Sequence, residues 1–226
     1  MAGRWGGLLC ALSIVLASPC VLAAGGRADF KLEPASAEAS RLADWIVDSG
    51  DNGRLPFVIV DKQGARVFVF SADGGLRGAS PALLGQSSGD DSAPGIGTRK
   101  LADIRPEERT TPAGRFVASL GQNLHGGEVL WVDYDAAISL HPVVTSNARE
   151  RRLQRLASAT PLDNRISYGC INVPPQFYRN VVSPAFRQSD GIVYILPETR
   201  PASAVFPRYP APPSVDGHAA GAPPRP

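Results

Sequence analysis

Cysteine is scarce in this chain. Only three cysteines occur among 226 residues, and Cys10 and Cys20 both lie within the first 24. Those residues predict a cleaved secretory signal peptide, because Arg4 is the only charge before a short apolar run, residues 8–16, which small residues follow up to Ala24. Cleavage would leave Cys170 alone, which excludes an internal disulfide. A lone cysteine in an exported protein is either an intermolecular partner or a thiol kept for chemistry.

Other absences narrow the function further. No apolar run approaches the roughly 18 residues of a membrane-spanning helix, so we expect no membrane association after signal cleavage and a periplasmic or otherwise exported location. The 23 Lys and Arg nearly balance the 21 Asp and Glu, which gives no reason to expect nucleic acid as a partner. Histidines and carboxylates with metal-ligand spacing are lacking, so we expect neither metal nor cofactor.

Four segments differ in composition. Residues 1–24 form the predicted signal peptide, and residues 25–55 form an N-terminal segment with a helix over 34–49, whose apolar residues recur on one face. Residues 56–197 form the main domain. Residues 198–226 form a predicted disordered tail, because nine of the 21 prolines lie in the last 30 residues among Ala, Gly and Ser.

The main domain is predicted to be mostly β. Short apolar runs separated by Gly- and Asp-rich turns are typical of a sandwich or barrel-like sheet. A polar, glycine-rich loop is expected over 86–111. The expected strands are 57–60, 66–70, 116–120, 128–132, 136–140 and 191–196.

The residues around Cys170 are compatible with a nucleophile. Gly169 permits a backbone angle that is closed to other residues and leaves the neighbouring N–H groups unshielded. If a thiolate attacked a carbonyl, the N–H groups of Tyr168, Gly169 and Cys170 could stabilise the oxyanion. The alternative is an ordinary turn whose cysteine only packs.

A thiol needs a base or a cation nearby to ionise at neutral pH. Three histidines are available. His218 lies in the predicted tail and His125 in a glycine-rich turn, whereas His141 ends an apolar strand that can hold its side chain rigidly. We therefore predict His141 as the base, with a structural histidine as the alternative.

Two motifs resemble the L,D-transpeptidase (YkuD-like) catalytic domain. Residues 111–116, Thr-Pro-Ala-Gly-Arg-Phe, resemble its T-P-x-G-x-F strand entry. His141 followed by residues 167–172, Ser-Tyr-Gly-Cys-Ile-Asn, resembles its His and S/T-H-G-C-hydrophobic-N/R signature. The match covers roughly residues 56–197. It implies a mostly β L,D-transpeptidase-like sandwich or barrel, here with an N-terminal helix and a helical insert near the active site.

The resemblance implies a reaction and roles for individual residues. The family's cysteine attacks the carbonyl after the L-centre of meso-diaminopimelate in a peptidoglycan stem tetrapeptide and expels D-Ala. Carried over, Cys170 is the nucleophile, His141 the general base and acid, and the Pro142 carbonyl orients the imidazole. Carbapenems would acylate Cys170. The implied substrate-binding residues are Ser167, Tyr168, Gly169, Asn172 and Arg165.

Three departures from the family pattern stand out. Tyr168 replaces the usual histidine before Gly-Cys, Pro142 replaces the common glycine after the base, and the segment between His141 and Ser167 is longer than usual. In that insert Asn147 and Glu150 resemble a helix N-cap, and Leu153 and Leu156 an apolar stripe. Its arginines either coat a solvated helix or grip stem-peptide carboxylates, with Arg165 the best single candidate.

Two other functions remain open. A catalytically degenerate fold-mate would bind peptidoglycan without turnover, which the change at Tyr168 favours. A disulfide-exchange protein would need a second cysteine to resolve a mixed disulfide.

Overall fold

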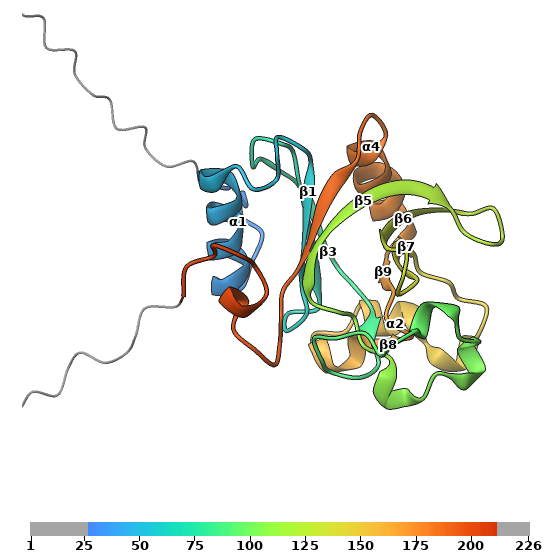
Figure 1. Ribbon diagram of the computed structural model, residues 1–226. Coiled ribbons are helices and arrows are strands. Elements are labelled where there is room, and N and C mark those ends of the chain that lie inside the picture. Colours follow the sequence, from blue (N-terminus) through green and yellow to red (C-terminus); the bar gives the residue numbers. More distant parts are fainter. Residues whose placement is uncertain (1–26, 212–226) are drawn as a thin grey trace, which may run out of the picture.

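The computed structural model describes residues 27–211, so the predicted signal peptide lies outside the described residues. The fold is mostly β, with an N-terminal helix and a helical insert, as the sequence predicted (Figure 1). Among the described residues no helix has both the length and the apolar character needed to cross a membrane. The helices are α1 (Ala37–Ser49), α2 (Arg152–Leu156), α3 (Pro175–Phe177) and α4 (Ser183–Phe186). The strands are β1 (Phe57–Asp61), β2 (Arg66–Phe70), β3 (Leu76–Pro81), β4 (Leu84–Gly85), β5 (Gly114–Gln122), β6 (Glu128–Asp133), β7 (Ile138–Pro142), β8 (Arg165–Ser167), β9 (Ile171–Val173) and β10 (Gly191–Ile195).

Eight strands form one sheet in the order β3-β2-β1-β10-β5-β6-β7-β9. Most neighbours are antiparallel, but β1 pairs with β10 and β7 pairs with β9 in parallel. A second, two-stranded parallel sheet joins β4 to β8. The two predicted catalytic residues lie at the β7–β9 edge: His141 on β7 and Cys170 directly before β9.

Strict alternation along the central strands supplies two hydrophobic cores. Successive side chains of a strand point to opposite faces. In β1, Phe57 and Ile59 belong to one cluster while Val58 and Val60 belong to the other. All five β1 residues are buried, which explains why the strand reads as a continuous apolar run.

Helix α1 covers the first core. Ser36 caps its N-terminus by accepting a hydrogen bond from the Ala39 N–H at 3.0 Å, and Gly50 ends it in the left-handed region at φ 67°. Leu42 and Ile46 are fully buried against the sheet. The helix predicted at 34–49 is therefore present and lies where Figure 1 places it, on one side of the sheet.

The predicted tail begins later than residue 198. Residues 198–211 are ordered: Phe206 and Tyr209 pack in the α1 core with 1% and 8% exposure, and Trp45 meets the Tyr209 ring edge-on at 5.5 Å. Proline content alone led to the early boundary, whereas these two aromatic side chains provide the apolar surface that anchors the segment. The rest of the predicted tail lies outside the described residues.

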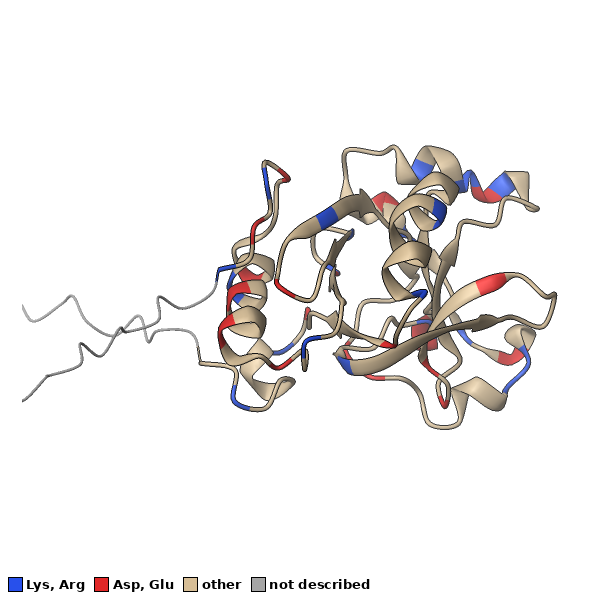
Figure 2. Ribbon diagram, turned by 90° about the horizontal axis from the view of Figure 1, so that it is seen from above, with Lys and Arg blue, Asp and Glu red and all other residues tan. Residues whose placement is uncertain are grey.

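The second core is enclosed by the curling of the sheet. Val58 of β1 and Leu140 of β7, at distant places in the strand order, pack in the same cluster. Tyr178 and Phe186 close this core from the segment in which a π turn, Tyr178–Val182, links α3 to α4. Charges of both signs are interspersed over the elements in the view of Figure 2.

The insert differs from its prediction. Asn147 does cap a turn with Glu150, but that turn is a single 3₁₀ turn, Ala148–Glu150, and α2 starts only after Arg151, whose φ is 51°. The left-handed residue breaks the predicted continuous helix. Leu156 is buried as expected, whereas Leu153 is 57% exposed.

Candidate active site

The parallel pairing of β7 with β9 places the predicted base and nucleophile together. His141 lies opposite Asn172 and Leu140 opposite Ile171, so Cys170, the residue directly before β9, comes next to Ser139. Alternate residues of a strand share a face, so Ser139, His141, Cys170 and Asn172 all project to one side. The Cys170 sulfur lies 3.7 Å from the Ser139 hydroxyl and 3.6 Å from the Ala137 carbonyl oxygen.

Gly169 holds the turn before the nucleophile. Its φ of 131° belongs to the region that only glycine enters easily, and an added Cβ would lie 2.7 Å from the Thr110 carbonyl oxygen. The Thr111 hydroxyl donates to the Gly169 carbonyl at 2.8 Å and accepts the Gly85 N–H at 2.8 Å. The turn is thus tied to the loop that precedes β5.

Ser167 closes the same turn from inside. Its hydroxyl, in a residue 3% exposed, donates to the Cys170 carbonyl at 2.6 Å and accepts the Gly169 N–H at 3.1 Å. The Gly169 N–H is therefore already occupied, which removes one of the three predicted oxyanion donors. The N–H groups of Tyr168 and Cys170 have no hydrogen-bond partner within residues 27–211. These two donors are left to stabilise negative charge.

The His141 ring is fixed by its neighbours. Its Nδ1 lies 2.8 Å from the Pro142 carbonyl oxygen, which only accepts hydrogen bonds, so Nδ1 carries the proton in the neutral ring. The Nε2 atom then carries the lone pair of the ring, and the Asn172 amide nitrogen lies 3.1 Å from it. Burial lowers the pKa of His141, but the hydrogen bond and charge attraction to Cys170, with the Pro142 carbonyl, raise it overall. The site is therefore suited to accept a proton at Nε2.

The Cys170 thiol responds in the opposite direction. Burial raises its pKa, but the hydrogen bond and attraction to His141, assisted by Ser139, bring the pKa below that of an ordinary cysteine. A thiolate is the reactive form of cysteine, so this environment favours nucleophilic chemistry.

Arg152 and Asn172 complete the site, and the sequence did not single out Arg152. Asn172 is 1% exposed, and its side-chain amide nitrogen lies 3.1 Å from His141 Nε2. Its amide oxygen accepts a 2.7 Å hydrogen bond from Arg152 Nη1. The Arg152 Nε donates in turn to Glu150. Only the basic character of the insert hinted at this contact, because it depends on the break at Arg151.

Tyr168 interacts with a cation. The Arg109 guanidinium lies over its ring, 4.0 Å from the centroid, and donates to the Ile104 carbonyl and to Gln86. The tyrosine that departs from the family pattern thus supports a different loop, the one that carries Arg109.

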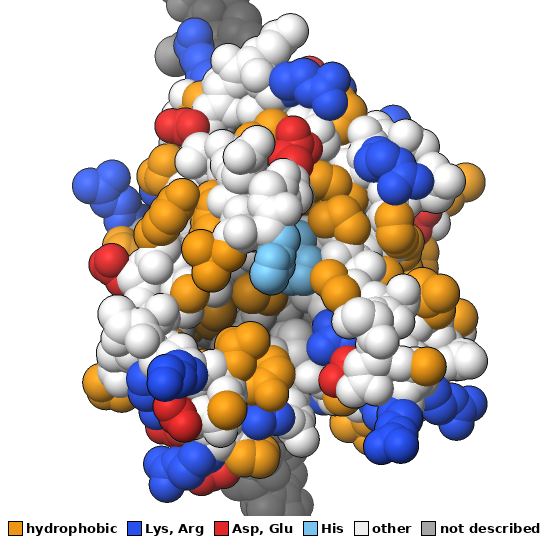
Figure 3. All heavy atoms as spheres, turned by 90° about the vertical axis from the view of Figure 1, so that its right-hand side faces the viewer, with side chains coloured by type: hydrophobic (Ala, Val, Ile, Leu, Met, Phe, Trp, Pro, Cys, Tyr) orange, Lys and Arg blue, Asp and Glu red, His pale blue; other side chains and the backbone are white. Residues whose placement is uncertain are grey.

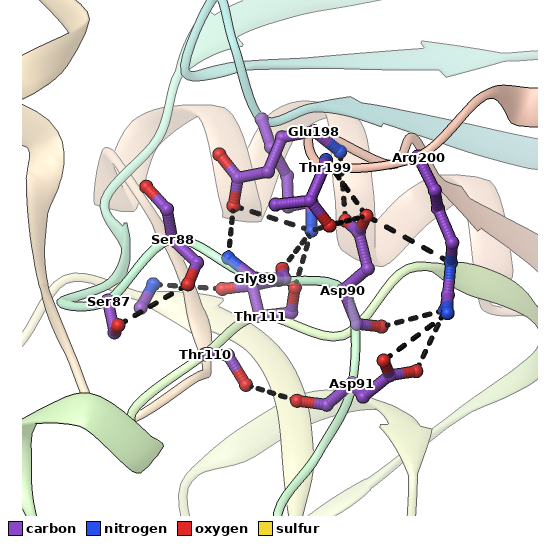
Figure 4. Close-up of polar contacts among 12 residues, drawn as sticks. Ser87, Ser88, Gly89, Asp90, Asp91, Thr110, Thr111, Glu198, Thr199 and Arg200 are labelled. Atoms are coloured by element: carbon purple, nitrogen blue, oxygen red, sulfur yellow. Dashed lines mark hydrogen bonds and ion pairs between the residues drawn. The ribbon is translucent and has the colours of Figure 1, made fainter.

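Arg165 lies in a buried charged network, which Figure 4 shows in part. Its guanidinium pairs with Glu198, at 2.5 and 3.3 Å to the two carboxylate oxygens. Lys62, fully buried, donates to Asp90 at 2.7 Å and to the Thr111 carbonyl at 3.0 Å. Substrate binding by Arg165 stays a prediction, and a substrate carboxylate would have to compete with Glu198.

One face of the molecule is hollowed. Figure 3 shows hydrophobic side chains around a depression on the right-hand side of Figure 1, with basic side chains at its border. Exposed apolar residues of the described chain include Val117, at 62%, and Tyr134, at 70%, whose ring stacks on Trp131.

Within residues 27–211 no three His, Cys, Asp or Glu side chains gather as metal ligands.

Comparison with known proteins gives similarity to solved structures only. No family model and no curated protein sequence matches the chain. An L,D-transpeptidase in complex with imipenem is 15% identical with a TM-score of 0.35, over 62% of this chain and 58% of that one. The catalytic domain of the Enterococcus faecium L,D-transpeptidase is 17% identical with a TM-score of 0.34, over 62% and 96%. L,D-transpeptidase 3 from Mycobacterium tuberculosis is 13% identical with a TM-score of 0.36, over 62% and 60%. This chain therefore spans less than two thirds of the first and the third protein.

Proposed function

We propose that this chain is an exported cysteine acyltransferase that acts on peptidoglycan stem peptides, as an L,D-transpeptidase or L,D-carboxypeptidase. One observation carries the proposal: the Cys170 thiol, whose pKa is lowered, comes directly before β9 beside His141 on β7, whose Nε2 carries the lone pair of the neutral ring. That combination is the requirement for nucleophilic catalysis by cysteine. The substrate class comes from the resemblance of residues 111–116 and 167–172 to the L,D-transpeptidase motifs.

The residues have defined tasks in this proposal. His141 Nε2 takes the thiol proton, and the Cys170 sulfur attacks the carbonyl after the L-centre of meso-diaminopimelate. The N–H groups of Tyr168 and Cys170 stabilise the oxyanion, while Gly169 and Ser167 hold the turn. The C–N bond breaks, and D-Ala leaves as the amine with the proton from His141. A thioester to Cys170 remains.

The second half of the reaction releases the enzyme. An acceptor amine, or water, attacks the thioester carbonyl while His141 removes its proton. The C–S bond breaks, and the Cys170 sulfur recovers a proton. An amine acceptor yields a crosslink and water yields a tripeptide. Arg165 would take part only where a substrate carboxylate displaces Glu198.

Product analysis tests the proposal. The mature protein and a Cys170→Ala control are incubated with disaccharide-tetrapeptide muropeptides, and the products are identified by mass spectrometry. Cysteine-dependent dimers indicate a transpeptidase, and tripeptides alone indicate a carboxypeptidase. A carbapenem should add its mass to the protein and not to Cys170→Ala. Turnover or labelling that survives in Cys170→Ala would contradict the proposal.

A non-catalytic peptidoglycan binder is the second candidate. The observation that favours it is the Asn172 amide, which lies 3.1 Å from His141 Nε2 and competes with the thiol for that lone pair. This candidate would be favoured if the mature protein and Cys170→Ala were both retained on isolated sacculi, while neither converted a muropeptide or bound a carbapenem.

A further inference from the structure

Arg152 is connected to the proposed base, His141, through the side chain of one residue, Asn172. The Arg152 side chain is only 13% exposed and lies in the insert, between β7 and β8. Its Nη1 donates to the Asn172 amide oxygen at 2.7 Å, and the Asn172 amide nitrogen lies 3.1 Å from His141 Nε2. Glu150 accepts from the Arg152 Nε and so holds the guanidinium in place.

Hydrogen-bonding rules fix the direction of this chain. A guanidinium has donors only, so the Asn172 atom that faces Arg152 must be the amide oxygen. The NH₂ group of Asn172 therefore points at His141 and donates to Nε2. At the other end of the ring, the Pro142 carbonyl requires a proton on Nδ1. Both ends of the imidazole thus select the same neutral form, with the lone pair on Nε2.

This arrangement opposes the proton transfer that catalysis needs. A proton that moves from Cys170 to Nε2 must displace the Asn172 N–H. Without Arg152 the Asn172 amide can turn over and present its oxygen to Nε2–H, which would stabilise the imidazolium. The positive charge of Arg152 acts in the same sense, because it lowers the pKa of His141 against the larger effect of Cys170.

The other elements around His141 bring few charges. The Cys170 thiol faces the ring from the loop before β9, and Arg152 with its partner Glu150 faces it from the insert. On β6, Leu130 and Trp131 are paired with Leu140 and Ser139 and carry no charge, whereas Asp133 is a carboxylate paired with Ile138, three residues before His141. Arg152 is the cation whose charge lowers the pKa of His141.

We propose that Arg152 is a positioning residue: by fixing the Asn172 amide it keeps His141 Nε2 as a hydrogen-bond acceptor, and so limits how readily Cys170 is ionised. The inference rests on the proposed role of His141 as base. It assigns the insert a task in the chemistry, in place of substrate binding by its arginines.

Imidazole NMR tests the proposal without any substrate. In the unmodified protein above the titration midpoint of His141, ¹⁵N shifts should show the neutral ring with its proton on Nδ1. Arg152→Met should raise the titration midpoint of His141 by about one pH unit, tenfold in the protonation equilibrium. Arg152→Lys, which again offers donors only, should stay close to the unmodified protein. Arg149→Met removes an exposed arginine from the same insert and serves as the control.

A second variant covers the case in which Arg152→Met fails to fold. Asn172→Asp keeps Arg152 and places an acceptor oxygen permanently at Nε2, so the His141 midpoint should rise at least as much. The rate of Cys170 alkylation by iodoacetamide at pH 6–7 should rise with it.

Three results would overturn the proposal. They are an Nε2–H tautomer of the neutral ring in the unmodified protein, an unchanged midpoint in Asn172→Asp, and equal shifts in Arg152→Met and Arg149→Met. None of these measurements depends on peptidoglycan. A protein with the predicted midpoints but no muropeptide turnover would refute the proposed function and leave this inference standing.

Discussion

Two groups of ionisable side chains lie on either side of Thr111, and they differ in whether their charges are permanently paired. In the buried network, Lys62 and Asp90 have side chains 0% and 1% exposed and are joined by a 2.7 Å ion pair. In the candidate active site, Cys170 and His141 are half-buried, and in the proposed reaction they exchange one proton. The network holds permanent charges, whereas the pair creates its charges only when the proton moves.

The difference lies in how completely each charge is compensated. Burial raises the pKa of Asp90, but hydrogen bonds from Lys62 and Thr199 and from the Glu198 N–H more than offset this, so its pKa lies well below the ordinary value. Stability from Asp90 is therefore present above its ordinary pKa, near 4, and is lost only as pH falls toward the depressed value. The Cys170–His141 pair instead balances burial against mutual attraction, so the pKa of each group depends on the other.

Thr111 connects the two groups. Its carbonyl accepts the Lys62 ammonium at 3.0 Å, and its hydroxyl donates to the Gly169 carbonyl at 2.8 Å. The fully compensated network thus anchors the turn that carries the nucleophile. Substitutions in the two groups should therefore have separable effects, on folding in one case and on thiol chemistry in the other.

Removal of Lys62 should have the largest effect. Lys62→Met leaves Asp90 charged and buried without its partner, and we expect a loss of about 3–5 kcal/mol in the free energy of unfolding. Urea denaturation followed by circular dichroism measures it. Lys100→Met removes an exposed lysine and should cost almost nothing. Equal losses in the two variants would show that the network is not what stabilises this region.

Thr111→Val should have an intermediate effect on both properties. The Gly85 N–H and the Gly169 carbonyl each lose a buried hydrogen bond, which predicts a loss of about 1–3 kcal/mol. The turn before Cys170 also loses its anchor, so carbapenem acylation should slow in the protein that remains folded. The control is Thr145→Val, on the exposed surface. A stability loss without slower acylation would separate the network from the active site.

His141→Ala should change thiol chemistry and leave stability nearly intact. The folded-state pKa of Cys170 is lowered by His141, so without it the thiolate should form only at higher pH. The midpoint of iodoacetamide alkylation against pH should move upward by about one unit or more, toward the value near 8.5 of a free cysteine. His125→Ala, in an exposed turn, is the control. An unchanged midpoint would reject His141 as the group that activates Cys170.

The sequence predicted what depends on local pattern. The continuous apolar run of β1, and the one-sided apolar pattern of α1 with its stop at Gly50, act within a few residues, so these elements were found. The Cys170–His141 pair was predicted from the order of two motifs, and its catalytic role stays a prediction. Arg152 was not singled out, because its contact with Asn172 needs the left-handed residue Arg151 to break the insert, and an arginine gives no local signal for that conformation.

The change at Tyr168 should have the smallest effect. Within residues 27–211 its hydroxyl makes no hydrogen bond, whereas its ring stacks under Arg109 at 4.0 Å, so Tyr168→Phe should change carbapenem acylation less than about twofold. Tyr168→His restores the usual family residue but offers Arg109 a ring that repels it once protonated. Acylation at pH 8 should then survive better than at pH 5.5. A large loss in Tyr168→Phe would mean that the phenol hydroxyl itself contacts the substrate. Tyr168 would then belong to the substrate-binding residues and would not only support the loop that carries Arg109.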